Sequence, residues 1–381
     1  MKLALIRRQF SATGGAELYL QRLLRALAER NHELHLFTES WEAMPEGVTL
    51  HSIGISATRA TRGLRFAEAV QNKLAGEKFD CVFSLERTLK QDVYRAGDGV
   101  HRVWLERRRQ FAPWWKKPFV GLGAFHRNVM ALEARTFNPK NTRRIIVNSE
   151  MVKLEILEHF RFPAERIHLI RNGVDVARFQ NGKRAETRAR FGVKDDEFLL
   201  LFAGSGWERK GLRFLLRPMA DLRLMRSVLG KKIPRQSAAP ELAPKAVKLL
   251  VVGKGRPPVS ASPDIIFAGS VNDAENFYAA ADLFVFLPIY EPSANVVVEA
   301  LAAGLPVVTS TQNGACELIR EGVNGSVIQN PANHAAVFAS VCFWMENLVP
   351  RPVKPVADIS LERNVSETLA VLELAAKEKL Q

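Results

Sequence analysis

Two carboxylates eight residues apart are the most informative feature of the sequence. Glu291 and Glu299 flank the residues PSANVVV, which follow the apolar run Leu283–Leu287. The proline, serine and asparagine between them favour a helix start, with Glu291 in the preceding loop and Glu299 two turns inside. A carboxylate in an apolar helix is costly unless it is paired or bound to a ligand. Sugar or ribose hydroxyls are suitable partners; the alternative is a Glu299 that faces solvent on an amphipathic helix.

A basic pair follows another apolar run. Residues 205–211 read SGWERKG and come directly after Phe198–Ala203. Arg209 and Lys210 would lie where a strand ends and a helix begins, at the edge where open α/β sheets bind ligands. The forked guanidinium and the compact ammonium together suit a diphosphate. A solvated charged turn is the alternative.

Two glycine-containing turns carry weaker signals. Residues 14–17 read GGAE between the first apolar run and a helical pattern. A helix N-terminus there could bind a phosphate through free N–H groups, although a tight βα turn explains the residues equally well. Residues 172–175 read NGVD and indicate a turn.

These motifs stand at the ends of short apolar runs that alternate with helical patterns, which predicts βαβ units and parallel sheets. The expected strands are Lys2–Ile6, Leu34–Phe37, Val48–Ile53, Cys81–Leu85, Ile145–Asn148, Phe198–Ala203, Leu249–Gly253, Ile265–Ala268, Leu283–Leu287 and Val307–Thr309. The expected helices are Ala16–Arg30, Gly121–Phe137, Glu150–Phe160, Leu212–Leu229, Asn295–Ala303, Ala332–Asn347 and Leu361–Gln381.

The 381 residues suggest two or three domains. The polar stretch Asp175–Lys194 is the expected boundary, because a fresh apolar strand follows it. Lys231–Lys245 and Arg256–Asp264 are rich in proline or polar residues and indicate exposed loops.

The composition indicates which kinds of binding partner and which cellular compartment to expect. The formal charge of +14 and the pI near 9.9 favour polyanions such as anionic membranes, nucleic acid or phosphorylated substrates. Cys81, Cys316 and Cys342 form no CxxC pair, so a cysteine zinc site or redox motif is not expected. The N-terminal apolar run is too short for a signal peptide, and no run approaches about 18 apolar residues. We therefore expect a cytoplasmic protein.

The order of the motifs resembles the retaining GT-B glycosyltransferases of family four. The resemblance rests on GGAE at 14–17, IRNGVD at 170–175, RKG at 209–211, and E-x7-E followed by EALAAGLPVVTS at 299–310. It extends over nearly the whole chain, and the E-x7-E segment is its specific part. Residues 40–42 (SWE) and 92–100 (DVYRAGDGV) are similar to the lipopolysaccharide core glucosyltransferases.

The resemblance implies an α/β fold of two Rossmann-like, doubly wound domains that face a cleft. Residues 1–180 would bind the acceptor, residues 181–360 would bind the nucleotide sugar, and helix 361–381 would cross back to the first domain. Four residues would serve catalysis: Arg209 and Lys210 at the leaving diphosphate, Glu291 at the transferred sugar, and Asp98 on the acceptor side. The implied donor-binding residues are Gly15, Ser205, Gly206, Ser293, Ala294, Asn295 and Glu299.

The leaving diphosphate needs positive charge. The sequence has no DxD triplet, and the basic pair with a helix N-terminus can supply that charge, so we expect no metal and no cofactor beyond the UDP-sugar substrate. The family implies retention at the anomeric carbon without a settled protein nucleophile, so Glu291 is not assigned as one.

A basic aromatic segment, His101–Val120, holds six Lys or Arg, one Glu and five aromatic residues. Such a segment suits an anionic membrane interface, with stacking on single-stranded nucleic acid and a solvated loop packed on the domain as alternatives. We expect a membrane or acceptor surface formed by Trp104, Arg107, Arg108, Arg109, Trp114, Trp115, Lys116 and Lys117.

The sequence thus predicts a retaining hexosyltransferase, peripheral on the inner face of the membrane. It would move a hexose, with glucose from UDP-glucose as our choice, to a lipopolysaccharide core or similar glycolipid. The alternatives are a GT-B enzyme of other chemistry, such as a nucleotide-sugar epimerase, and a binding module for anionic lipid or nucleic acid with a degenerate site.

Overall fold

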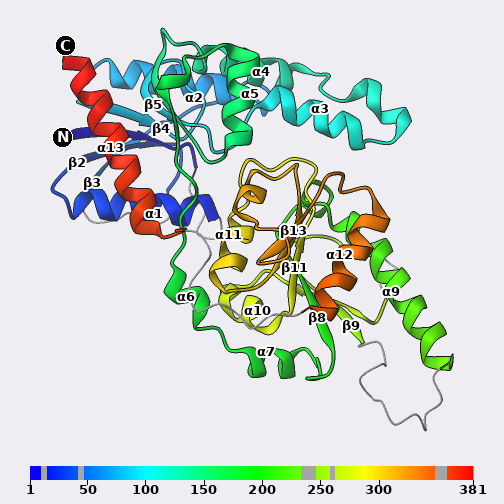
Figure 1. Cartoon of the computed structure of the whole chain (residues 1–381). Coiled ribbons are helices and arrows are strands. Elements are labelled where there is room, and N and C mark those ends of the chain that lie inside the picture. Colours follow the sequence, from blue (N-terminus) through cyan, green and yellow to red (C-terminus); the bar gives the residue numbers. More distant parts are fainter. Residues whose placement is uncertain (10–14, 42–46, 233–245, 258–261, 348–357, 381) are drawn as a thin grey trace. The chain divides into compact units, whose positions relative to one another are not determined.

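The computed structural model of the chain describes residues 1–9, 15–41, 47–232, 246–257, 262–347 and 358–380 (Figure 1). It divides into two compact units. The first comprises Met1–Gly173 and Leu361–Gln381, and the second comprises Val174–Ser360. Among the described residues, no helix combines the length and the apolar character that crossing a bilayer requires.

The first unit is built on a seven-stranded parallel sheet of order β3-β2-β1-β4-β5-β6-β7. Its strands are β1 (Lys2–Ile6), β2 (Glu33–Thr38), β3 (Val48–Ser52), β4 (Cys81–Ser84), β5 (Gln91–Arg95), β6 (Thr142–Val147) and β7 (Ile167–Leu169). Its helices are α1 (Gly15–Ala28), α2 (Arg62–Leu74), α3 (His101–Phe111), η1 (Trp114–Phe119), α4 (Ala124–Thr136), α5 (Glu150–Phe160), η2 (Ala164–Arg166) and α13 (Leu361–Leu380).

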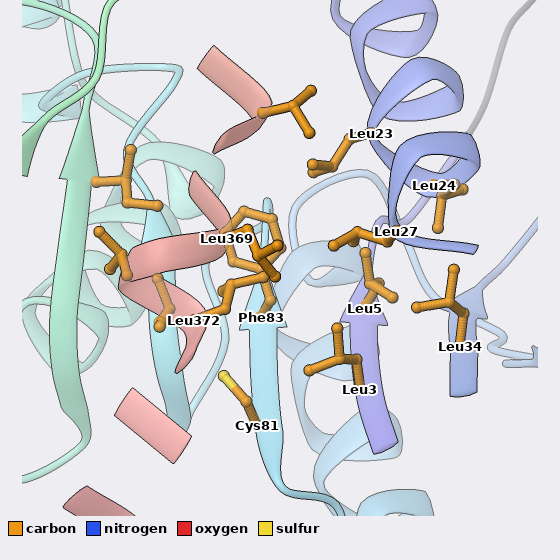
Figure 2. Packing of buried hydrophobic residues seen from close by; sticks show 14 of the residues in the cluster. Leu3, Leu5, Leu23, Leu24, Leu27, Leu34, Cys81, Phe83, Leu369 and Leu372 are labelled. Carbon is orange, nitrogen blue, oxygen red and sulfur yellow. The ribbon is translucent and has the colours of Figure 1, made fainter. Parts of the chain in front are cut away.

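The C-terminal helix α13 completes the core of this first unit. Leu369 and Leu372 of α13 pack in one buried cluster with Leu5 of β1, Phe83 of β4 and Leu23 of α1 (Figure 2). Each leucine or phenylalanine side chain that is buried in this way stabilises the fold by roughly 1.5–3 kcal/mol. The helix α13 is therefore a structural part of the unit that contains the N-terminus.

The second unit is built on a six-stranded parallel sheet of order β10-β9-β8-β11-β12-β13. Its strands are β8 (Phe198–Ala203), β9 (Val247–Val252), β10 (Ile265–Gly269), β11 (Leu283–Phe286), β12 (Val307–Ser310) and β13 (Gly325–Ile328). Its helices are α6 (Val176–Gln180), α7 (Arg184–Arg190), α8 (Trp207–Lys210), α9 (Leu212–Lys232), α10 (Ala274–Ala280), α11 (Asn295–Ala302), η4 (Gly314–Leu318) and α12 (His334–Glu346).

The sequence predicted the three central strands of the second sheet from their continuous apolar runs. Every residue of β8, β11 and β12 is buried, as expected for parallel strands covered on both faces. The strand order reverses between β8 and β11, which are neighbours although they are far apart in the chain. The carboxyl ends of these two strands therefore form a topological switch point, where open α/β sheets bind ligands.

All expected strands and helices form, with shifts at their ends. The sequence did not predict the strands β5, β7 and β13, the helices α2, α3, α6, α7, α8 and α10, or the short 3-10 helices η1, η2 and η4. The expected boundary stretch 175–194 contains α6 and α7, both within the second unit. The loop expected at Lys231–Lys245 lies outside the described residues except for 231–232, which end α9, and the loop at Arg256–Asp264 lies partly outside them.

Candidate active site

The switch point of the second unit brings the basic pair and the Glu291 loop together. Residues 204–211 leave β8, and residues 287–294 leave β11. Gly211 makes the contact between the two loops possible, because a Cβ atom there would lie 1.6 Å from the carbonyl oxygen of Leu287. Its φ of +82° is also a conformation that glycine adopts without strain. The backbone N–H of Ile289 donates to the carbonyl of Arg209 at 3.0 Å and joins the loops again.

Both cations of the basic pair reach one carboxylate oxygen. The Lys210 ammonium lies 2.5 Å from Oε2 of Glu291, and the Arg209 guanidinium lies 3.1 Å from the same atom. The Lys210 and Glu291 side chains are 15% and 14% exposed, whereas Arg209 is 44% exposed. The solvated-turn alternative is therefore wrong for Lys210. Arg209 keeps part of its guanidinium at the surface, where an anion can reach it.

Lys210 is a desolvated cation. Burial lowers the pKa of its ammonium, the neighbouring Glu291 carboxylate opposes that shift, and Arg209 adds to it. The ammonium also lies 5.4 Å from the ring centre of Phe286, the last residue of β11. A positive charge held in a partly dry setting by one carboxylate is suited to stabilise additional negative charge nearby.

Backbone hydrogen bonds hold the Glu291 loop in place. The N–H of Glu291 donates to the Gln312 carbonyl at 2.8 Å, and the N–H of Gly314 donates to the Glu291 carbonyl at 2.9 Å. The Glu291 side chain is thus presented from a segment bonded to the chain that follows β12. Its position does not depend on its ion pairs alone.

Asn313 is a buried residue that the sequence analysis missed. Its Oδ1 accepts from the N–H groups of Ala294 and Ala315 at 3.1 and 3.2 Å, and its Nδ2 donates to Thr309 Oγ1 at 3.1 Å. Thr309 in turn donates to the carbonyl of Phe286 at 2.8 Å. The detectable signal is an asparagine three residues after a buried strand, a position typical of side chains that bond to loop backbone.

The start of α11 differs from the prediction. The N-cap is Ala294, and no side-chain cap bond forms there. The predicted helix start among Pro292, Ser293 and Asn295 is confirmed, but it forms without a side-chain cap, and Asn313 of another loop binds the Ala294 N–H. Ser293 is buried, and Asn295 is the first helical residue. Because α11 begins at residue 295, Glu299 lies one turn inside the helix and not two.

Glu299 is paired in the way that its apolar surroundings require. The buried Tyr278 hydroxyl of α10 donates to Oε2 of Glu299 at 2.8 Å. Burial, and secondarily the Glu299 charge, raise the pKa of Tyr278 well above its ordinary value, so the phenol stays protonated as a donor. Against the alternative that Glu299 faces solvent on an amphipathic helix, the side chain is half-buried and is oriented by this bond to a buried tyrosine.

The remaining predicted donor residue pair, Ser205 and Gly206, is exposed at the start of α8. Ser205 Oγ accepts from the Lys254 N–H at 2.9 Å, which ties this loop to the segment after β9. In that segment a Cβ atom at Gly255 would lie 2.3 Å from the Trp207 ring, so the close packing of the two loops requires glycine.

Two predicted residues belong to the first unit, whereas the group just described belongs to the second. Gly15 is the first residue of α1, and the preceding residues 10–14 of the expected phosphate turn lie outside the described residues. Asp98 is exposed in the loop between β5 and α3. Its charge helps to raise the pKa of Glu86, a shift dominated by burial and opposed by Arg7.

The basic aromatic segment forms α3 and η1. The exposed fractions of Trp114, Trp115 and Phe119 are 79%, 55% and 70%, so the alternative in which these rings pack on the domain is wrong. Lys116 and Lys117 are exposed between them. Trp104 is covered in part, because its ring stacks 5.3 Å from the His101 ring and the Arg108 guanidinium lies 5.3 Å over it. Arg107 and Arg109 bond within the segment, to Gln110 Oε1 and the Val120 carbonyl.

Comparison with known proteins agrees with this architecture. Residues 13–178 match the Glycosyltransferase Family 4 model, and residues 197–347 match the model of glycosyl transferases group 1. Together with the two parallel sheets, these matches show that the chain belongs to the GT-B glycosyltransferases. The predicted family and fold class are confirmed.

Individual relatives share this organisation. The lipopolysaccharide glucosyltransferase WaaG of Escherichia coli K12 is 26% identical over 333 residues, which cover 84% of this chain and 82% of that protein. A crystal structure of WaaG has a TM-score of 0.74 at 22% identity and covers 98% of this chain and 95% of that one. The structure of HepE from Anabaena in complex with UDP-glucose has a TM-score of 0.64 at 16% identity and covers 99% of both chains. The two structures show the shared fold.

Proposed function

We propose that this protein is a retaining, metal-independent glucosyltransferase that uses UDP-glucose and acts on a lipopolysaccharide core or similar glycolipid. The observation that supports the reaction best is the convergence of Arg209 and Lys210 on Glu291 at the switch point of the second sheet. The similarity to WaaG, named a lipopolysaccharide glucosyltransferase, supports the sugar and the acceptor. The similarity to HepE, solved with UDP-glucose, supports the nucleotide sugar.

The basic pair would stabilise the leaving diphosphate. As the bond from the anomeric carbon to the diphosphate oxygen breaks, negative charge grows on that oxygen. Lys210 and Arg209 are fixed in position before the reaction, so little reorganisation is needed to meet this charge. Glu291 balances their charge before the donor binds and, in this proposal, lies beside the transferred sugar. The acceptor hydroxyl would add on the face that the leaving group vacates and pass its proton to the departing diphosphate oxygen. Addition on that face retains the anomeric configuration.

Glu299 would hold the ribose of the donor. One carboxylate oxygen accepts from Tyr278, and a carboxylate has further acceptor sites for ribose hydroxyls. The N–H groups of Ser293 and Asn295 at the start of α11 would contact donor oxygens. The predicted contact through the Ala294 N–H does not hold, because that group donates to Asn313. Tyr278 thus joins the predicted residues as a positioning residue for Glu299.

The exposed aromatic residues of η1 would dock the enzyme on the inner face of the membrane, where a glycolipid acceptor is presented. Trp114, Trp115 and Phe119 could insert at the headgroup level while Lys116 and Lys117 bind anionic lipid. Each basic residue near such a surface contributes about 1 kcal/mol. The net charge of +14 acts in the same direction. Asp98 would act on the acceptor side, and Gly15 near the diphosphate.

Calorimetric titration with a panel of nucleotide sugars in EDTA tests the donor proposal. We expect saturable binding of UDP-glucose by the wild type, loss of that binding in Glu299→Ala, and no change in Glu346→Ala, an exposed carboxylate at the end of α12. Tight binding of a different nucleotide sugar would overturn the choice of donor. A requirement for Mg²⁺ or Mn²⁺ would overturn metal independence.

Vesicle flotation tests the membrane proposal. Wild-type protein should float with vesicles that contain anionic phospholipid, and a Trp114→Ser, Trp115→Ser variant should remain largely in solution. Leu224→Ser is the matched control, because Leu224 is 64% exposed on α9 in the second unit. Equal flotation of wild type and the double tryptophan variant would contradict docking through η1.

A further inference from the structure

Two histidines and a carboxylate, none of which is assigned above, converge on one face of the first sheet. His35 lies two residues before Phe37 in β2, and His51 of β3 is the register partner of Phe37. Residues at alternate strand positions share a face, so both imidazoles lie on the same side of the β2–β3 pair. Their Nδ1 and Nε2 atoms are 2.8 Å apart.

Glu77 reaches the same place from the segment between α2 and β4. Its Oε2 lies 4.0 Å from His35 Nδ1. One ligand atom from each of His35, His51 and Glu77 can be chosen so that all three lie within 4.8 Å of one another. Among the described residues, this is the group of histidine, cysteine and carboxylate side chains that could hold a metal ion.

A second carboxylate orients the His35 ring. Glu33 Oε1 lies 2.9 Å from His35 Nε2, so the proton of the neutral ring belongs on Nε2 and the Nδ1 lone pair faces His51 and Glu77. This arrangement, in which a carboxylate binds the far nitrogen of a ligating imidazole, recurs in metal sites and raises the basicity of the ligand. Glu33 would thus act through His35.

Aromatic rings fix the two imidazoles further. The Phe37 ring is parallel to His51 with centroids 4.3 Å apart, and the Phe79 ring meets His35 edge-on at 5.1 Å. The His35 side chain is only 7% exposed. Both rings therefore have little freedom to lose when a ligand binds, which lowers the entropic cost of binding.

The local charge suits a cation. The Glu33 and Glu77 carboxylates pair with the Lys2 ammonium at 3.1 and 2.7 Å, and the charge of Lys73 also acts on His51. The groups in direct contact, two carboxylates and one ammonium, carry one net negative charge when the imidazoles are neutral. Glu77 is 35% exposed, so solvent and an incoming ion can reach its carboxylate.

We propose that His35 Nδ1, His51 Nε2 and Glu77 bind one divalent transition-metal ion of the zinc class, with water as the fourth ligand. In a tetrahedral site with bonds of about 2.0–2.1 Å, ligand atoms lie roughly 3.3 Å apart. The separations of 2.8 and 4.0 Å that involve His35 differ from that by under about 1 Å, and the His51 and Glu77 ligand atoms lie within 4.8 Å of each other, so side-chain shifts complete the site. His51 changes tautomer, its proton moving to Nδ1, and the imidazole hydrogen bond is replaced by two metal bonds. The ion joins the edge strand β3 to β2 and to the Glu77 segment.

The test uses the full-length, tag-free protein and Zn²⁺ in competition with a chromophoric chelator. We expect one equivalent of tightly bound Zn²⁺, with affinity at least about tenfold weaker in His51→Phe and in Glu77→Gln. His51→Phe keeps a ring stacked on Phe37 but has no ligating nitrogen. A loss of Zn²⁺ affinity in this variant therefore reflects the missing ligand and not unfolding of the protein. His159→Ala, which changes a histidine of α5 outside the cluster, should bind Zn²⁺ as the wild type does.

Co²⁺ substitution identifies the ligands. The three free cysteines Cys81, Cys316 and Cys342 are competing sites, and a thiolate ligand would add a charge-transfer absorption band that nitrogen and oxygen ligands lack. We expect the absorption bands of tetrahedral Co²⁺ and no thiolate charge-transfer band. Absence of Zn²⁺ binding, equal binding by wild type and His51→Phe, or a thiolate band would each overturn the proposal. These readouts do not involve the donor, so their failure is distinct from failure of the proposed function.

Discussion

Replacing Glu291 by glutamine should cost much more folding stability than replacing Lys210 by methionine. The ammonium and guanidinium lie 2.5 and 3.1 Å from one Glu291 oxygen. At an effective dielectric constant of about 20, unit charges about 3 Å apart attract by roughly 5 kcal/mol, before the desolvation that opposes this attraction. Glu291→Gln leaves two facing cations without a counter-charge.

The expected losses follow from which charges remain. Removing one partner of a buried ion pair costs about 3–5 kcal/mol, and the partial exposure of this group places Glu291→Gln near about 3 kcal/mol. In Lys210→Met, Glu291 keeps Arg209 as its partner, and we expect a loss of about 1 kcal/mol. The double variant should be nearly as stable as Lys210→Met alone, because the uncompensated ammonium is gone.

Lys210→Met, which should cost little stability, should nevertheless cause a large loss of activity. Loss of one preorganised donor to a developing negative charge lowers kcat by about 10²–10³-fold, and we expect this for Lys210→Met. Urea denaturation gives the stabilities. Initial rates of UDP release from UDP-glucose, with purified lipopolysaccharide core as the acceptor and EDTA present, give kcat. A Glu291→Gln variant as stable as the wild type would refute the electrostatic account. A Lys210→Met variant with wild-type kcat would refute the role at the diphosphate.

Three further predictions concern other contacts of the structure. Tyr278→Phe removes the hydroxyl that orients Glu299 and should weaken UDP binding about tenfold, or about 1.4 kcal/mol, in calorimetry. Gly211→Ala places a Cβ atom 1.6 Å from the Leu287 carbonyl and should cost about 3 kcal/mol or more in a thermal melt. Burial lowers the pKa of His101 to about 4 in the fold, against about 6.5 in the unfolded chain. The unfolded state therefore binds more protons between these values, so stability should fall as pH drops from 6.5 toward 4, and less steeply in His101→Gln.

Each of these has a contrary outcome. Unchanged UDP affinity in Tyr278→Phe would remove the hydroxyl from the donor site. A wild-type melting temperature for Gly211→Ala would show that the two loops separate without cost. Equal slopes of melting temperature against pH in wild type and His101→Gln would assign the acid sensitivity to other groups.

The sequence predicted the elements whose burial comes from apolar side chains. The strand Phe198–Ala203 and the helix Glu150–Phe160 form with the expected bounds, because their patterns need no partner to be recognised. The strand β5 was missed because it reads QDVYR, yet every residue is buried. Asp92 in β5 is neutralised by Arg143 and by Lys379 of α13, a pairing over 287 residues in sequence that no local pattern reveals.

The residues of the candidate site also divide into those that the sequence predicted and those that it did not. Arg209, Lys210 and Glu291 were selected from residue type and position, and the structure brings them together. Tyr278 and Asn313 were not selected, because the bond of each to the α11 segment joins residues about twenty positions apart in sequence, which no local pattern reveals. His35 and His51 were missed for a similar reason: only the strand register places them side by side.

Asn313 has a consequence for any attempt to move this site into another protein. A chimaera that exchanged only residues 287–303 would carry both carboxylates of the motif but would lose the amide that fixes the first turn of α11. The transplanted loop would then adopt a conformation set by the recipient. Asn313 and Thr309 should therefore be inherited together with Glu291 and Glu299, and specificity swaps between related enzymes should place their downstream junction beyond residue 315.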